Sequence, residues 1–341
     1  MAKKLKYLLL GLVVILLGVV AFFSINRKTP AAPPKKEEVL IPIRIGWQVP
    51  WATEGQLVQT LKHTEILKGH GLAGDFKGFD YGGPLNEAAL AKQVDVIFTA
   101  DQPAATLLSK NPNWKIIGRL MYNRVSLYVP PNSPIETSKD LKGKTVAMPF
   151  GAAAQRMALN EEALAGLDPK KDVKNINLGI YEQNPLVTDK NAVKWGDIDA
   201  MAGFDPVPAV FEEKGLVRNL HVGQVISLIL MSDEYISANP EAPRKFLESF
   251  VDAYDYYRSN VTQANQWFRE EAKLDVSDVA LATSSSVEPN LKVTSKADIS
   301  IGFSEGDYKT MQEASDFLLA QEMIKTPVNM RNFVDLSYLQ K

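Results

Sequence analysis

The chain has 341 residues, 45% hydrophobic and 23% charged, with a net charge of -2, which are values of a globular protein and not of a disordered or fibrous one. Without the five basic residues among the first 28, the net charge is -7 and no basic tract remains, which argues against nucleic acid as a partner. Because there is no cysteine, disulfides, thiolate metal sites, a cysteine nucleophile and a lipidated N-terminal cysteine are all excluded.

The first predicted element is a membrane segment. Residues 7–25 form an uncharged apolar run of 19 residues with basic residues on both sides. As a helix it would extend about 28 Å, close to the thickness of the hydrocarbon core. A cleavable signal has a shorter apolar core and small residues at its cleavage site, whereas this run ends in bulky residues, so residues 1–28 favour an uncleaved anchor over a removed signal. The flanking charges leave the orientation undecided.

Residues 29–40 follow as a Pro- and Ala-rich stretch with two lysines and two glutamates, which predicts an extended spacer. From residue 41 onward, strand-like and helical patterns alternate. In the first block we predict strands at 41–48, 94–99 and 125–129, and helices at 56–68 and from 104 onward.

A second alternating block then begins. We predict strands at 144–148, 175–178, 199–202, 220–222 and 226–231, and helices at 152–164 and 207–214. From residue 237 the pattern is mostly helical, with one aromatic face made by Phe246, Phe250, Tyr254 and Tyr257. Alternating strands and helices imply an α/β architecture with mainly parallel sheets, and two such blocks suggest two lobes. The strands at 125–129 and 226–231 bracket the second block and are hinge candidates.

Catalytic, metal and cofactor motifs are missing from the sequence. Residues 138–145 end like a phosphate-binding loop, but a serine replaces the first glycine and a strand follows where a helix is needed. The histidines at 63, 70 and 221 are not paired at metal-ligand spacing. We therefore expect no catalytic residue, no metal and no cofactor.

The loops after the predicted strands carry the candidate ligand-binding residues, because ligands of open α/β sheets bind where the carboxyl ends of strands converge. The Gly-containing turn from a strand into a helix at 149–155 would offer free N–H groups to an anion. The aspartates in two other loops are equally well explained as helix caps. The predicted site comprises Trp47, Gln48, Trp51, Asp101, Gln102, Gly151, Ala152, Ala153, Phe204 and Asp205.

In their order along the chain, several stretches resemble the sulfonate/nitrate/taurine-type substrate-binding proteins of ABC importers, which have the type II periplasmic-binding fold. The matching stretches are 43–48, 82–104, 140–155, 195–206 and 330–339, and the sequence DLKGKTVA before a Gly-rich turn is the most specific of them. Gln93 and residues 184–194 depart from the usual pattern, which puts the ligand in doubt.

The resemblance implies a two-lobed receptor outside the cytoplasmic membrane. Lobe one would comprise residues 41–129 and 232–341, and lobe two residues 130–231, with a small-molecule ligand between them. An ABC permease and an ATPase are the implied partners, together with the membrane through the N-terminal helix. A tethered ligand sensor and a pyrimidine-precursor-binding protein or enzyme are the alternatives.

The residue types at the predicted site suggest a more specific ligand. Aromatic faces and carboxylates together suit an ammonium group. Asp101 and Asp205, with the tryptophans, therefore predict a zwitterion or an amine-bearing ligand over nitrate or a simple alkyl sulfonate, unless both aspartates only cap helices.

Overall fold

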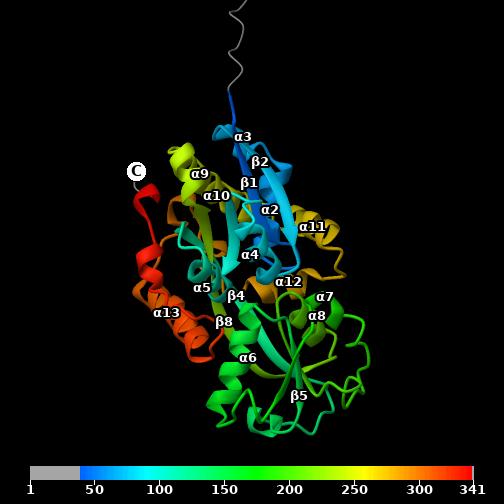
Figure 1. Ribbon diagram of the computed structural model, residues 1–341. Coiled ribbons are helices and arrows are strands. Elements are labelled where there is room, and N and C mark those ends of the chain that lie inside the picture. The colour runs from blue at the N-terminus through cyan, green and yellow to red at the C-terminus, as the bar shows by residue number, and fades with distance from the viewer. Residues whose placement is uncertain (1–38, 340–341) are drawn as a thin grey trace, which may run out of the picture. The chain divides into compact units, whose positions relative to one another are not determined.

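The computed structural model describes residues 39–339, and Leu40 onward belongs to one compact unit (Figure 1). The predicted membrane segment and nearly all of the predicted spacer lie outside the described residues. Within the described range, no helix combines the length and the apolar character that crossing a bilayer requires.

A mixed sheet of eight strands forms the centre of this unit, in the order β2-β1-β3-β8-β4-β7-β5-β6. The strands are β1 (Ile41–Gln48), β2 (Leu72–Phe79), β3 (Val96–Ala100), β4 (Trp114–Val129), β5 (Thr145–Met148), β6 (Lys174–Asn177), β7 (Ala200–Phe204) and β8 (Arg218–Ser232). β1 pairs in parallel with β2 and β3, and β5 pairs in parallel with β6 and β7. The predicted α/β class is confirmed.

Two long antiparallel strands, β4 and β8, join these parallel groups (Figure 1). The C-terminal part of β8 pairs with β3, and the C-terminal part of β4 pairs with β7. We call the part built on β1–β3 lobe one and the part built on β5–β7 lobe two. The passage between the lobes lies inside both long strands, near residues 121–126 of β4 and 223–227 of β8.

This pairing bears on the predicted lobe boundaries. Residues 125–128 pair with β7 and so lie in the sheet of lobe two, whereas residues 227–231 pair with β3 and lie in the sheet of lobe one. The predicted hinge segments therefore flank the passage between the lobes, and each of them is paired with a strand of one lobe. Movement of the lobes about the crossing stays a prediction.

Helices cover both faces of the sheet. Those of lobe one are α2 (Glu54–His63), α3 (Ile66–Gly69), α4 (Gly82–Leu90), α5 (Asp101–Lys110), α9 (Asp233–Ala238), α10 (Ala242–Ser259), α11 (Val261–Ala272), α12 (Asp278–Ser285) and α13 (Glu305–Ala320). Those of lobe two are α6 (Ala153–Leu164), α7 (Ile180–Gln183) and α8 (Val207–Glu213). The predicted aromatic face of α10 is buried in the core, where Phe98 of β3 contacts Phe246 and Phe250.

Several local elements differ from the predictions, among them β4, which begins at Trp114 and not at residue 125. β2 and α4 were not predicted, because β2 contains Gly74, Asp75 and Gly78, which weaken the strand pattern. The predicted helix 56–68 is two helices, separated at Thr64 and Glu65. The two predicted strands at 220–222 and 226–231 are one strand, β8, that continues through Gly223.

Candidate functional site

The lobes meet where their parallel strands end. β2, β3 and β5 each lead at their carboxyl ends into a helix, α4, α5 and α6 respectively, and these helix starts face the surface between the lobes. We call this surface the seam. It is made of Trp51, Gly83, Asp101 and Gln102 of lobe one and of Gly151, Gln155, Arg156 and Phe204 of lobe two.

The seam is closed by direct contacts. The rings of Trp51 and Phe204 lie 5.0 Å apart between centroids, and the Ala52 N–H donates to the Asp205 carbonyl at 3.2 Å. A Cβ atom added to Gly151 would lie 3.6 Å from the Cα of Gly83. Gly151 also has a φ of 83°, a left-handed conformation that favours glycine. The backbone conformation therefore selects glycine at this turn, while the space beside Gly83 would admit a Cβ atom in ordinary contact.

Polar side chains join α5 to α6 across the seam. Asp101 Oδ2 pairs with the Arg156 guanidinium, and Asp101 Oδ1 accepts the Gln102 backbone N–H at 2.7 Å. The Gln102 side-chain amide donates to Gln155 Oε1 at 3.4 Å, and the same oxygen accepts the Gly151 N–H at 2.8 Å. The predicted anion-binding turn is thus in contact with the predicted residues of α5 through Gln155.

Several polar atoms of this region are buried and have no hydrogen-bond partner among residues 39–339. They are Trp51 Nε1, Glu54 Oε2, Thr99 Oγ1, Gln102 Oε1 and Arg156 Nε. Thr99 lies at the end of β3, next to the start of α4, because a Cβ on Gly82 would come within 3.3 Å of its hydroxyl. Since an unsatisfied buried polar group costs about 1–3 kcal/mol, such a gathering marks a place where a ligand with polar atoms would be stabilised.

The two predicted acidic residues are each paired with an arginine. Asp205 Oδ2 lies 3.4 Å from Arg124, and Asp205 Oδ1 accepts the Ala209 N–H at 3.2 Å. Burial raises the pKa of Asp205 to about 7, against the opposing effect of Arg124. Burial likewise raises the pKa of Asp101, with Arg156 opposing it. Both carboxylates therefore have partners within the chain.

Burial also raises the pKa of Glu54 well above its usual value. Its Oε1 accepts the Gln48 N–H at 2.6 Å, while Oε2 has no partner within residues 39–339. Burial therefore disfavours the charged form of Glu54 at this position.

The predicted site residues fall into two groups. Trp47 and Gln48 are buried within lobe one: Trp47 lies under Lys62, whose Nζ is 5.8 Å from the ring centroid, and Gln48 contacts Glu54 and the Phe98 carbonyl. The others gather along the seam as described, with Ala152 and Ala153 buried at the start of α6 and Asp205 directly after Phe204. All are buried except Gly151, which is half-buried.

Sequence reasoning missed Arg156, Gln155, Arg124, Glu54 and the Gly82-Gly83 pair. Gly82-Gly83 follows a strand just as Gly151 does, so this turn could have been found had β2 been recognised. No sequence signal distinguishes Arg156 from the other arginines, because which face of α6 meets lobe one depends on how the lobes pack.

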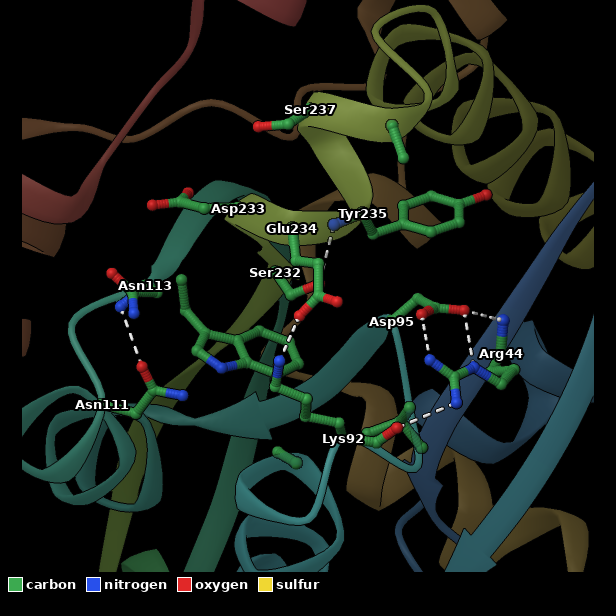
Figure 2. A pocket seen from close by; sticks show the side chains of 14 residues that line it. Arg44, Lys92, Asp95, Asn111, Asn113, Ser232, Asp233, Glu234, Tyr235 and Ser237 are labelled. Carbon is green, nitrogen blue, oxygen red and sulfur yellow. Dashed lines mark hydrogen bonds and ion pairs between the residues drawn. The ribbon is translucent and has the colours of Figure 1, made fainter.

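A polar cavity of lobe one lies elsewhere, beside the starts of β3 and β4 and the end of β8 (Figure 2). It has a volume of about 470 Å³. Its cations are neutralised by the chain itself, because Arg44 contacts Asp95 at 2.5 Å and Lys92 contacts Glu234 at 2.6 Å, as Figure 2 shows. It therefore offers no free charge to a ligand.

A family model described as NMT1/THI5 like matches residues 85–264, more than half of the chain. The chain belongs to the NMT1/THI5-like family. The matched residues include α5, α6 and the part of α4 from Leu85 onward, and thus most of the polar contacts of the seam. No curated protein is similar enough to the chain to count as a relative.

Solved structures of other proteins have the same fold as this chain. The alkanesulfonate-binding protein SsuA from Xanthomonas axonopodis pv. citri bound to MOPS is 20% identical, with 86% of this chain and 98% of that chain covered and a TM-score of 0.70. The periplasmic aliphatic sulphonate binding protein SsuA from Escherichia coli is 21% identical, with coverages of 86% and 92% and a TM-score of 0.69.

A variant of the desulfurization enzyme DszB in complex with biphenyl-2-sulfinic acid is 14% identical, with coverages of 87% and 97% and a TM-score of 0.63. These likenesses confirm the two-lobed periplasmic-binding fold that the sequence predicted. Because binding proteins and an enzyme share it, function must be argued from the seam itself.

Proposed function

We propose that this protein is the extracytoplasmic solute-binding component of an ABC importer, and that it captures a small organic anion of the sulfonate type between its lobes. The observation that carries the proposal is the seam, where helix starts from both lobes surround buried polar atoms that lack a partner. Two solved neighbours of the same fold are sulfonate-binding proteins, which agrees with this choice of ligand.

The starts of α4, α5 and α6 supply the physical reason for an anion. None of the residues preceding these helices, Tyr81, Ala100 and Ala152, makes a side-chain cap. The N–H groups of a first helical turn have no partner within the helix, and they carry the positive end of the helix dipole. An anion at the meeting point of these starts would be stabilised by N–H groups from both lobes, and so would favour the closed form.

The N-terminal segment completes the proposal. A segment at residues 7–25 that stays in the membrane would hold the two lobes on the extracytoplasmic side, with residues 29–40 as spacer. A permease and an ATPase, which receive the ligand and drive its transport, would be the partners. A membrane-tethered sensor of the same fold would bind its ligand in the same seam, and a permease gene beside this one separates the two functions.

An enzymatic function is less well supported. The enzyme among the neighbours was solved as a cysteine-to-serine variant, and the present chain contains no cysteine that could serve in its place. Measured turnover of a bound sulfonate or sulfinate would support an enzymatic function instead.

A thermal-shift screen of the full-length chain in detergent tests the proposal. Alkyl sulfonates, nitrate, taurine and pyrimidines are the compounds to compare. A ligand present at 100 times its dissociation constant adds about 2.7 kcal/mol to stability, so we expect a sulfonate to raise the melting temperature by several degrees. Stabilisation by pyrimidines alone, or by none of the compounds, would contradict the proposed ligand class.

A further inference from the structure

One ion pair joins the lobes at the centre of the seam. Asp101 is completely buried at the start of α5, and its Oδ2 contacts the guanidinium of Arg156 on α6. The Arg156 side chain is 15% exposed, while its buried Nε finds no partner among the residues that the structure describes. The pair is therefore a buried contact that the chain makes across the seam between its own lobes.

A second internal contact occupies the neighbouring amide. Gln155 Oε1 accepts the Gly151 N–H, the donor that the sequence predicted for an anion. The two donors best placed for a ligand, Gly151 N–H and the Arg156 guanidinium, thus each hold an oxygen from a side chain of the protein. One carboxylate oxygen and one amide oxygen stand where two oxygens of an oxyanion would be accepted.

The charges restrict how a ligand enters. If an anion approached Arg156 while Asp101 stayed in place, two negative charges would share one guanidinium in a buried region where Coulomb repulsion is strong. If the anion replaces Asp101, the guanidinium offers its planar pair of N–H groups to two ligand oxygens.

We propose that Arg156 is the anion-binding residue of this protein, and that Asp101 is an internal competitor that pairs with Arg156 and latches the lobes together until a ligand anion displaces it. The ligand role of Arg156 rests on the proposed function, whereas the contact between Asp101 and Arg156 holds the lobes together in the absence of a ligand. The ligand class that follows is a small organic oxyanion with no ammonium group, such as an alkyl sulfonate. Both aspartates of the site already pair with arginines, so neither is left for a cation.

Two substitutions distinguish the role of Asp101 as a latch from the role of Arg156 as an anion-binding residue. Asp101→Asn removes the competing charge while keeping an oxygen that accepts the Gln102 N–H, and Arg156→Gln removes the cation. Both break the ion pair, so both should open the seam. Their effects on affinity should be opposite: we expect Asp101→Asn to bind ethanesulfonate about three- to tenfold more tightly, and Arg156→Gln to bind it more than tenfold more weakly.

Opening is measured by the distance between two spin labels. The chain has no cysteine, so labels at Glu87→Cys on α4 and Leu164→Cys on α6, both exposed, are unique. In the full-length protein in detergent and without ligand, electron–electron resonance should give a longer distance population for both variants than for the parent. The matched control is Asp275→Asn, which removes an exposed inter-lobe contact of 3.1 Å to Lys214 and should leave the distance unchanged.

The outcomes are distinguishable from those for the proposed function. Binding of sulfonates by the wild type, combined with equal or weaker ethanesulfonate binding by Asp101→Asn, overturns the latch and leaves the proposed function standing. Weaker binding of taurine, but not of ethanesulfonate, by Asp101→Asn would instead assign Asp101 to an ammonium group and overturn the inference. Unchanged label distances in both variants also overturn it. A wild type that binds no sulfonate overturns the ligand role of Arg156 together with the proposed function.

Discussion

At the scale of single residues, buried carboxyl groups make the stability of this protein depend on pH. Burial raises the pKa of Glu162 on α6 to about 7, against a hydrogen bond of 2.9 Å from Asn175. Burial raises the pKa of Asp205 to about 7 as well. A carboxyl group whose pKa is higher in the folded state binds its proton more tightly there. It therefore favours folding at low pH, and this contribution is lost as the pH rises from about 4.5 to about 7.

We expect Glu162→Gln to flatten this pH dependence. Glutamine keeps an acceptor for Asn175 but cannot ionise, so the variant should match the wild type near pH 4.5 and be more stable at pH 8, by at most about 3 kcal/mol. Urea unfolding between pH 4.5 and 8 measures the difference. Glu87 is exposed and provides the control, since the stability of Glu87→Gln should equal that of the wild type at every pH. Parallel curves for Glu162→Gln and wild type would show that Glu162 stays ionised in the folded protein.

At the scale of elements, α5 and α6 differ from three other helices in how they begin. The side chains of Ser232, Ser277 and Ser304 cap α9, α12 and α13 by accepting a backbone N–H of the first turn. Alanines stand at the corresponding positions of α5 and α6, Ala100 and Ala152, and make no such bond. A missing cap costs helix stability but leaves N–H groups for a ligand.

We therefore expect Ala152→Ser to raise the stability of the protein and to lower its affinity for the ligand. The backbone of Ala152, with φ -91° and ψ 159°, suits a cap, so serine should raise the stability of the protein by about 0.5–1 kcal/mol. The new hydroxyl would compete with the ligand for the first-turn N–H groups and weaken sulfonate binding roughly three- to tenfold. Calorimetry and thermal unfolding measure the two effects. Higher stability at unchanged affinity would mean that the anion does not use the start of α6.

Ser304→Ala is the matched control for this experiment. It removes the cap of α13, where the Ser304 hydroxyl accepts the Asp307 N–H at 3.2 Å, and should lower stability by about 1 kcal/mol without changing affinity.

At the scale of the described unit, the two sides of the seam differ in chemistry. On the α8 side, Ala209 packs in an apolar cluster with residues of lobe one, among them Ala52 and Phe268. On the α5–α6 side the contacts are the polar pairs Asp101–Arg156 and Gln102–Gln155. Separating the apolar side would expose hydrophobic surface to water, whereas polar groups can exchange one partner for another. The lobes should therefore open on the α5–α6 side.

For the whole chain, the apolar run at residues 7–25 predicts that the mature protein keeps residues 1–28 and fractionates with membranes. We expect it to resist extraction by high salt and to be released by detergent, because its attachment would be hydrophobic. N-terminal sequencing of the purified protein gives the direct answer, and a first residue beyond Asn26 would show that the segment is a removed signal.

Much of the lobe architecture could be predicted from the sequence because it follows from short-range pattern. The alternation of Ile41, Ile43 and Ile45 predicted β1 with its observed bounds, and the bounds of β3, β5, α6 and α8 were correct to within two residues. β2 could not be predicted in this way, since its glycines and Asp75 are tolerated only because the strand pairs with β1 along its whole length.

The sequence by itself determined the α/β class and the exclusion of every cysteine-based chemistry, and it predicted candidate ligand-binding loops, because periodicity and composition are local properties. Only the tertiary structure decided what the charged residues of those loops do. From the sequence, Asp101 and Asp205 are equally well ligand-binding carboxylates or helix caps, but Arg156 lies 55 residues from the first and Arg124 lies 81 residues from the second. The Asp101–Arg156 pair exists because β4 and β8 bring the two lobes face to face, and the Asp205–Arg124 pair exists because β7 pairs with β4. The partner of each charge is thus set by tertiary pairing and packing.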